Sequence, residues 1–244
     1  MILSELGRFK LTSSMEIPEI KPMHGWKEVK IEESSQPLVC LNHFDPSGRI
    51  RLSPQYFLHE IPGTSPFMYL REEAADRLTF AASKLRKGTN IVVFDAHRSI
   101  EIQGEIFNSF RVKLKTLNPR LPEDELTKLT EIYVSLPSRD PLKPPPHSTG
   151  GAIDLSIEDD YSNLARMGTD WDSFDIKSQT NYFKNVNPLF HYNRRVLYAI
   201  MTSAGFTNYP EEWWHYDFGN QFWGFLTEKS AIYGQIKGGE LYDK

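Results

Sequence analysis

A histidine and an aspartate stand seven positions apart in the stretch PPPHSTGGAIDLSI, residues 144–157. His147 follows a rigid proline run, and the two glycines after it permit a tight turn or a close backbone approach. In the strand expected next, Asp154 shares a face with the small Ala152. A buried carboxylate is costly unless it is paired or binds a metal. Either Asp154 and His147 are therefore metal co-ligands, or Asp154 bonds the glycine amides in a structural turn.

A second cluster, EEWWHYDF (211–218), places His215 among aromatic residues just after two acids. Two carboxylates beside two tryptophans would be expensive in a plain core strand. In a regular strand, Glu211 would share the face of His215, and Glu212 would point to the opposite face. A bend or bulge near residues 210–213 would be needed to bring Glu212 beside His215. The spacing alone leaves both glutamates open.

Two neutral imidazoles and one carboxylate, with water in the fourth position, make a catalytic zinc site. The metal lowers the pKa of its bound water towards about 7 and polarises a carbonyl oxygen. A nearby glutamate can then accept the proton of the water and deliver it to a leaving amine. The two clusters together predict this chemistry. The single cysteine, Cys40, excludes a Cys-rich metal site, so any ligands must be histidines and carboxylates.

The stretch FDAHRSIEIQ places Arg98 where a buried strand ends and a helix begins. An arginine is effectively always charged, so Arg98 cannot be the base. It can stabilise an oxyanion or clamp a carboxylate. The alternative is a structural salt bridge to Asp95 or Glu101. His97 has the opposite strand parity from Arg98 and ranks below the histidines of the two clusters as a metal ligand.

The elements that must position these residues mix helices and strands without a βαβ rhythm. Apolar spacing, caps and terminal charges predict helices over 71–86, about 100–117, 122–136 and 187–205. Short runs rich in β-branched and aromatic residues predict strands over 90–97, 151–157 and 211–218. We therefore expect one α+β domain over 36–244, with a small, mostly antiparallel sheet flanked by helices. Residues 1–35 are expected to be a lead-in segment that wraps the surface.

Composition narrows the class of protein. The chain has 244 residues, of which 39% are hydrophobic and 25% charged, as in soluble globular proteins. A formal net charge of −4 gives no basic footprint for nucleic acid. No apolar stretch of about 18 residues predicts a membrane span, and the start lacks the pattern of a signal peptide. We expect a cytoplasmic protein without nucleic-acid or membrane partners; its oligomeric state is left open.

The sequence resembles the zinc D-alanyl-D-alanine dipeptidases, the VanX-like members of the peptidase M15 family, from about residue 36 to 225. The motifs that carry the resemblance are DAHRSIEIQ, HSTGGAID, MGTDWD and NRRVLYAIMTSAGFTNYPEEWWHYDFGNQFW. The resemblance implies the fold shared with D,D-carboxypeptidases and the hedgehog signalling domain. It also implies one Zn²⁺ per chain. The family's H-x6-D pattern makes His147 and Asp154 zinc ligands, and its E-W-W-H pattern makes His215 the third ligand and Glu212 the general base.

The D-x-x-R motif of the family falls on Arg98 and implies that it stabilises the oxyanion. The counterpart of M-G-T-x-F-D makes Asp172 a candidate for holding the free ammonium of the dipeptide; the alternative is a turn or helix-cap aspartate. This sequence departs from the family at Pro145, which replaces a serine and offers no donor. The stretch LNHFD (41–45) also lacks the tyrosine of the family's Y-x-x-x-N-F. Both departures bear on substrate anchoring rather than on zinc or the base.

Our hypothesis is a zinc-dependent dipeptidase whose partner is a small dipeptide, D-alanyl-D-alanine or a related short D-amino-acid dipeptide. The first alternative is a D,D-carboxypeptidase or peptidoglycan endopeptidase of the same family, which acts on longer peptides. A site closed by bulky loops would favour the dipeptidase, and an open groove would favour this alternative. The second alternative is a non-catalytic, zinc-containing binding module, which has no need of a base.

Overall fold

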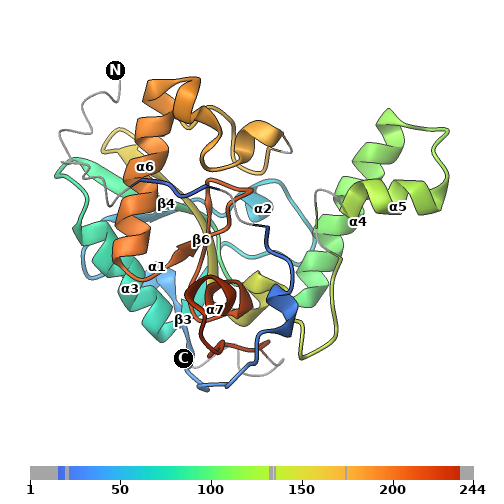
Figure 1. Ribbon diagram of the computed structural model, residues 1–244, viewed down its shortest axis with the longest axis horizontal. Helices are drawn as coiled ribbons and strands as arrows, with labels where there is room; N and C mark the ends of the chain where they lie inside the picture. Colours follow the sequence, from blue (N-terminus) through green and yellow to red (C-terminus); the bar gives the residue numbers. More distant parts are fainter. Residues whose placement is uncertain (1–15, 20–21, 132–133, 135, 174, 237–244) are drawn as a thin grey trace.

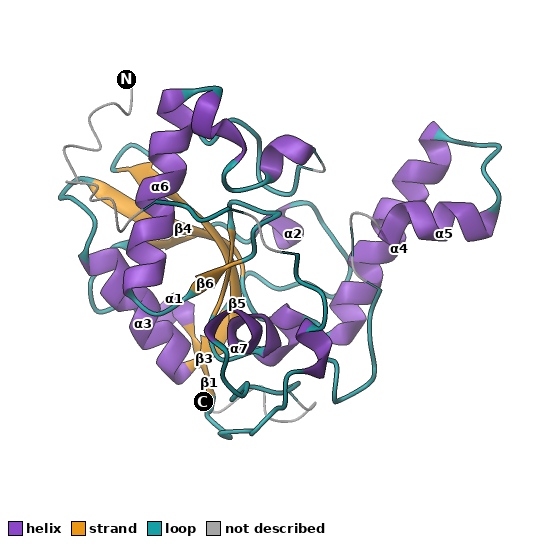
Figure 2. Cartoon of the chain, in the orientation of Figure 1, coloured by secondary structure: helices purple, strands orange, loops and turns teal. Residues whose placement is uncertain are grey.

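The computed structural model describes residues 16–19, 22–131, 134, 136–173 and 175–236 (Figure 1). A twisted sheet lies at the centre, with helices packed on one side of it and a helical hairpin projecting on the other (Figure 2). No helix in this described part of the chain is long and apolar enough to span a membrane.

The central sheet has the strand order β2-β4-β5-β7-β6. Of the four strand pairings in this sheet, β2–β4 is parallel and the other three are antiparallel. Its strands are β2 (Ile50–Leu52), β4 (Thr89–Asp95), β5 (Ala152–Asp159), β6 (Thr207–Asn208) and β7 (His215–Asp217). A separate antiparallel pair consists of β1 (Leu38–Cys40) and β3 (Tyr69–Arg71). The predicted α+β fold with a mostly antiparallel sheet is confirmed.

The longer helices lie where the sequence predicts them. They are α3 (Glu72–Ser83), α4 (Ile100–Leu117), α5 (Glu123–Glu131) and α6 (Pro188–Ser203). Ser99 caps α4 by accepting a hydrogen bond from the amide of Ile102, and Asn187 caps α6 in the same way. The tail predicted for α5 includes residues 132, 133 and 135, which lie outside the described part of the chain. No sequence pattern predicted the shorter helices α1 (Leu41–Phe44), α2 (Gln55–Leu58) and α7 (Gln221–Thr227), nor the 3-10 turns η3 (Trp26–Glu28), η4 (Pro146–Thr149), η5 (Ile176–Ser178) and η6 (Tyr182–Asn185).

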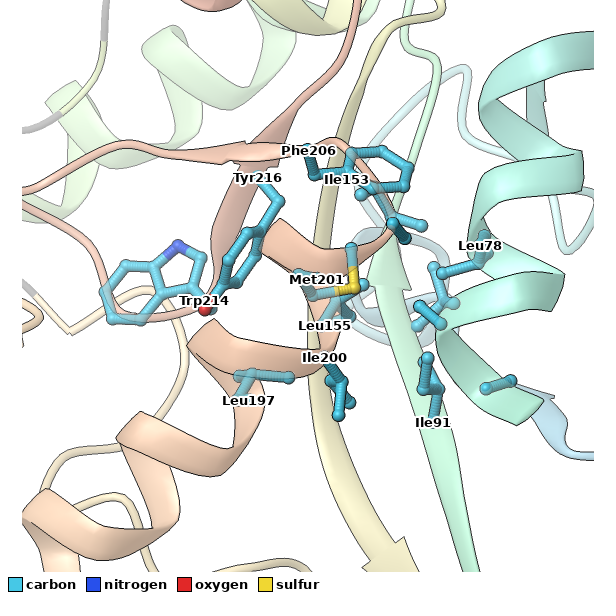
Figure 3. Close-up of a cluster of buried hydrophobic side chains, with 14 of the residues drawn as sticks. Leu78, Ile91, Ile153, Leu155, Leu197, Ile200, Met201, Phe206, Trp214 and Tyr216 are labelled. Atoms are coloured by element: carbon cyan, nitrogen blue, oxygen red, sulfur yellow. The ribbon is translucent and has the colours of Figure 1, made fainter. Parts of the chain in front are cut away.

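The hydrophobic core fills the space between the sheet and the helices α3 and α6 (Figure 3). Ile153 and Leu155 of β5 are fully buried there, against Leu78 of α3 and Ile200 of α6. Successive side chains of a strand point to opposite faces, so Asp154 lies on the face away from this core. One face of the sheet thus stabilises the fold, and the other is free to carry polar chemistry.

The lead-in runs beside α7, where the blue segment passes the red helix in Figure 1. The amide of Glu32 donates to the carbonyl of Ala231 at 2.7 Å, and the amide of Ala231 donates to the carbonyl of Lys30 at 2.8 Å. The amide of Ser34 donates to the carbonyl of Ile232 at 2.9 Å. Part of the predicted lead-in is therefore hydrogen-bonded to the main body, and its division from the domain at residue 35 stays a prediction.

Candidate active site

Three neighbouring strands place titratable side chains in one row across the sheet. The register pairs Asp95 of β4 with Asp154 of β5, and it pairs Asp154 with His215 of β7. The β4–β5 register is irregular between Val93 and Asp95, and such a bulge re-aims the side chains next to it. Asp154 therefore has an aspartate on one side and a histidine on the other.

His147 joins this row from η4, the short 3-10 turn that precedes β5. Gly150 ends the turn with a φ of 71°, a conformation that favours glycine. A Cβ on Gly151 would lie 2.3 Å from the carbonyl oxygen of Phe218, so only glycine fits there. The amide of Gly151 donates to Oγ1 of Thr149 at 3.1 Å rather than to Asp154. The glycines thus supply the expected turn and close approach, while the carboxylate faces the histidines.

Three buried donor atoms converge at the centre of the row. Nε2 of His147 lies 3.2 Å from Nδ1 of His215 and 3.4 Å from Oδ1 of Asp154. Nδ1 of His215 lies 3.1 Å from the same Oδ1. In a tetrahedral zinc site with bonds of about 2.0–2.1 Å, neighbouring ligand atoms stand about 3.3–3.4 Å apart. The three atoms therefore form a triangle of the size that a tetrahedral metal ion requires.

The outer nitrogens of both imidazoles have partners that fix the tautomer. Nδ1 of His147 donates to the carbonyl of Ala96 at 2.7 Å, and Nε2 of His215 donates to Oδ1 of Asp217 at 3.1 Å. A neutral imidazole carries one N–H, so both inner nitrogens turn a lone pair towards Asp154. With neutral rings, three acceptor atoms face one another without a donor, and a metal cation between them would satisfy all three. An outer carbonyl and an outer carboxylate are the usual partners of metal-binding histidines, so the residues fit a metal ion.

The electrostatics of the buried donors point the same way. Burial alone would raise the pKa of Asp154, but the neighbouring His147 and His215 hold it well below its usual range. Burial alone would lower the pKa of His215, but Asp217 and Asp154 raise it well above the ordinary value. The site thus keeps the Asp154 carboxylate ionised and favours a positive charge at His215.

The chain turns between β6 and β7, and this turn brings Glu212 rather than Glu211 to the cavity. Oε2 of Glu212 lies 4.0 Å from Nδ1 of His215, and 32% of the Glu212 side chain is exposed. Its removal from bulk water, opposed by His215, raises the pKa of the Glu212 carboxyl to about 8. Glu211 is exposed and accepts a hydrogen bond from Nε2 of Gln179 at 2.8 Å. The structure therefore contains the bend that a regular strand would have lacked.

Asn208 holds this turn in place. Its Nδ2 donates to the carbonyl oxygens of Glu212 and His215, each at 2.9 Å, and its Oδ1 accepts from the hydroxyl of Thr180 at 2.7 Å. The side chain is buried. Asn208 thus links the backbone of Glu212 to the backbone of His215.

Arg98 both forms a salt bridge and lines the cavity. Its Nη1 donates to Oδ2 of Asp95 at 3.0 Å, and this same oxygen lies 3.1 Å from Nδ1 of His147. Glu101, the other expected partner, lies 4.0 Å from Arg139 instead. Nε of Arg98 is buried with no hydrogen-bond partner among the described residues, so it remains an available donor.

His97 does not join the cluster. It lines a neighbouring cavity of about 470 Å³ rather than the one that holds the three donor atoms. Burial, together with the nearby His147 and Arg71, lowers the pKa of His97 to about 4. The side chain is therefore a neutral imidazole at neutral pH.

Asp172 lies in a turn, and its carboxyl group faces the cavity. Its φ of 56° is in the left-handed region. The hydroxyl of Tyr56 points to Oδ2 of Asp172 over a long 3.4 Å contact, and the neighbouring Trp171 donates from Nε1 to Oδ2 of Asp154 at 3.1 Å. Burial and the negative Asp154 raise the pKa of Asp172 to about 7. The turn aspartate of the sequence analysis is thus also a group of the cavity wall.

The cavity around these groups has a volume of about 190 Å³. Pockets for drug-sized ligands usually measure about 300–1,000 Å³, so this one suits a smaller molecule. Pro145 is part of its wall, as are Trp26, Tyr209 and Phe222. Tyr209 and Phe222 lie within the long motif that ends at Trp223 but were given no role from the sequence, and no motif includes Trp26. Among the other residues that sequence reasoning missed, Asp217 had a usable signal, because a strand residue two positions after His215 shares its face.

Comparisons with known proteins identify the family of the chain. Residues 67–231 match the D-ala-D-ala dipeptidase family, Peptidase_M15. A D-alanyl-D-alanine dipeptidase of Synechocystis sp. is 29% identical over 248 residues, which cover 88% of this chain and 98% of the relative. One from Enterococcus faecalis is 36% identical over 108 residues, which cover 39% of this chain and 50% of the relative. The solved VanYB structure with D-alanine-D-alanine covers 69% of this chain and 83% of its own at 16% identity, with a TM-score of 0.42, too remote for a conclusion. Because the family match spans more than half of its length, the chain belongs to the D-ala-D-ala dipeptidase family, Peptidase_M15.

Proposed function

We propose that this protein is a zinc-dependent dipeptidase that hydrolyses D-alanyl-D-alanine or a closely related short D-amino-acid dipeptide. The observation that carries the proposal is the convergence of Nε2 of His147, Oδ1 of Asp154 and Nδ1 of His215 at 3.1–3.4 Å from one another. Glu212 stands beside them in a small cavity. A metallopeptidase needs these parts together: three ligands, a base and room for a small substrate.

His147, Asp154 and His215 would hold one Zn²⁺ per chain, with the remaining position left for water or substrate. A zinc ion there supplies Lewis acidity, which polarises the scissile carbonyl and lowers the pKa of a bound water to about 7. Asp217 keeps the ring of His215 oriented through its bond to Nε2. The carbonyl of Ala96 does the same for His147.

Glu212 moves the proton in this proposal. Its carboxylate takes a proton from the attacking water and passes it to the nitrogen of the leaving amine. A carboxyl group whose pKa is raised to about 8 exchanges a proton near neutral pH more readily than an ordinary glutamate. Glu211, which is exposed and bonded to Gln179, has no such place in the reaction.

Arg98 stabilises the negative charge that develops on the carbonyl oxygen. Its guanidinium lines the cavity, and Asp95 fixes its orientation through the 3.0 Å salt bridge. A preorganised cation at a developing oxyanion typically contributes a few kcal/mol to the barrier, about 10²–10³ in rate. The negative charge on the carbonyl oxygen is thus stabilised by the fixed guanidinium of Arg98, and no water molecules have to reorient around it.

Asp172 holds the free ammonium of the dipeptide. It lines the cavity beside Tyr56, and an ionised carboxylate is the natural partner of an amine. This assignment requires a free amino terminus on the substrate. The cavity volume of about 190 Å³ also favours a dipeptide over the longer peptides of a D,D-carboxypeptidase or endopeptidase. The proposal takes the cytoplasm as the setting, which the single cysteine supports.

The test is amine release from D-alanyl-D-alanine by the purified, zinc-loaded protein, with longer peptides ending in D-alanyl-D-alanine assayed in parallel. Glu212→Gln should lower kcat by several orders of magnitude and keep one zinc per chain, and Glu211→Gln is the matched control that should stay active. Cleavage of only the longer peptides would move the protein to the carboxypeptidase alternative. A zinc-loaded protein that cleaves none of them would favour the binding module.

A further inference from the structure

Trp26 belongs to the lead-in, outside residues 67–231 that match the family, yet it lines the reaction cavity. We propose that Trp26 closes the end of this cavity that receives the carboxyl-terminal residue of the dipeptide, and that it limits the size of that residue. The inference rests on the proposed function and concerns a specificity-determining residue. The cavity has two ends of different chemistry.

The first end is polar and lies on the side of Asp154. Trp171 donates to Oδ2 of Asp154 at 3.1 Å, and the ring of Tyr56 lies 5.0 Å from the ring of Trp171. Arg98 stands 5.3 Å from the Tyr56 ring, and Tyr56 contacts Asp172. This end carries the carboxylate proposed for the substrate ammonium.

The second end is aromatic and lies on the side of His215. The ring of Phe222 is 6.1 Å from the ring of His215, and Tyr209 stacks on Phe222 at 4.9 Å. Trp26 packs edge-on against Phe222 with 4.3 Å between the ring centroids. A dipeptide whose ammonium lies at Asp172 and whose scissile carbonyl lies at the three donor atoms extends its second residue towards these rings.

Gln221 fixes Trp26 in this place. The Gln221 side chain is buried, and its Nε2 donates to the carbonyl of Lys27 at 3.2 Å, inside the short η3 turn, and to the carbonyl of Val29 at 2.8 Å, directly after the turn. The same nitrogen donates to the carbonyl of Leu142 at 3.0 Å, in the loop before His147. One carboxamide therefore ties the lead-in to α7 and to the proline-rich loop. Because Trp26 is fixed in this way, it should exclude large substrate side chains instead of moving aside for them.

The test compares three dipeptides, D-Ala-D-Ala, D-Ala-D-Phe and D-Phe-D-Ala, on the zinc-loaded wild type and on Trp26→Ala. The variant should raise kcat/KM for D-Ala-D-Phe relative to D-Ala-D-Ala by about tenfold or more, because a single added methylene in a pocket already changes selectivity about 10–200-fold. The ratio for D-Phe-D-Ala to D-Ala-D-Ala should change less than about twofold, because the first residue lies at the polar end. His24→Ala, an exposed residue two positions before Trp26, is the control and should leave all ratios unchanged.

Two further variants keep the inference falsifiable if Trp26→Ala folds poorly. Trp26→Leu, which keeps an apolar side chain, should relax the same ratio by a smaller factor. Gln221→Leu should relax it while Trp26 is still present. The role of Trp26 would be overturned if a folded variant kept the kcat/KM ratios of the wild type, or if kcat/KM rose equally for both phenylalanine dipeptides. Either result would leave the proposed dipeptidase function standing. A zinc-loaded wild type that cleaves no dipeptide would overturn the proposed function itself, and this inference with it.

Discussion

Replacement of Asn208 by leucine tests how the fold positions the base. Leucine keeps the branched heavy-atom shape of asparagine and removes three hydrogen bonds: two that Nδ2 donates to the carbonyls of Glu212 and His215 at 2.9 Å, and one that Oδ1 accepts from Thr180 at 2.7 Å. At about 1 kcal/mol for each bond, the free energy of unfolding should fall by about 3 kcal/mol. The His215 carbonyl keeps the amide of Tyr209 at 3.1 Å, so the loss falls mainly on Glu212.

The effect on catalysis should exceed the effect on metal binding. With its backbone released, Glu212 loses its fixed position beside the three donor atoms, and a displacement of about 1 Å can cost up to about 100-fold in rate. We therefore expect kcat for D-alanyl-D-alanine to fall by about 10- to 100-fold while the protein still binds one zinc. Urea unfolding of the zinc-loaded protein, initial rates and metal analysis measure the three quantities.

Thr180→Val is the matched control for Asn208→Leu. It removes one of the three hydrogen bonds and leaves both bonds to the turn, so it should cost about 1 kcal/mol of stability and little activity. If Asn208→Leu loses stability but keeps kcat, Asn208 stabilises the fold without positioning Glu212. If neither stability nor kcat changes, the hydrogen bonds described for Asn208 contribute nothing.

Three other predictions follow from the buried charges. Asp217→Asn should weaken zinc binding by about 10- to 100-fold, because it removes the carboxylate that holds His215; competition with a chelator measures this, and an unchanged affinity would contradict it. His97 has a pKa of about 4 in the fold and about 6.5 when unfolded, so the unfolded chain binds the proton first as pH falls. The free energy of unfolding should therefore drop by up to about 3 kcal/mol between about pH 6.5 and pH 4, and by less in His97→Gln. Denaturant unfolding at each pH measures this, and an equal drop in the two proteins would disprove it. Because the pKa of Asp172 is raised to about 7, this carboxyl group is protonated as pH falls below about 7, and KM for the dipeptide should rise. Asp172→Asn should raise KM at every pH. A KM that changes neither with pH nor with this substitution would refute the binding of the ammonium by Asp172.

The residues that the sequence brought to notice are those whose geometry is local. His147 and Asp154 are linked by a short turn, and strand alternation correctly puts Asp154 on the face away from the core. The same alternation misleads for Glu212, because the chain between β6 and β7 is a turn that side-chain hydrogen bonds hold in place. The amide of Asn208 selects that turn, and no spacing rule indicates which carbonyls an asparagine will bind. The resemblance to a family, rather than parity, is what favoured Glu212 over Glu211.

Contacts between distant segments were beyond prediction for a different reason. Trp26 meets Phe222, and Tyr56 meets Asp172, across long stretches of sequence and without any motif that pairs them. Strands β1, β2, β3 and β6 have two or three residues each, too few to show an alternating pattern. The capped helices α4 and α6 were predictable because the signals that begin them lie within a few residues. Pairing order and cavity walls depend on how such elements pack together.

The most direct test of the central claim is a zinc titration of the metal-stripped protein, followed by D-alanine release from D-alanyl-D-alanine. If His147, Asp154 and His215 hold one catalytic zinc, activity should be absent without metal and rise linearly to a plateau at about one equivalent per chain. Asp154→Asn should require far more zinc to reach any activity, because it removes the one charged ligand. Full activity in the stripped protein, or a plateau unaffected by Asp154→Asn, would contradict the metal site on which the whole account depends.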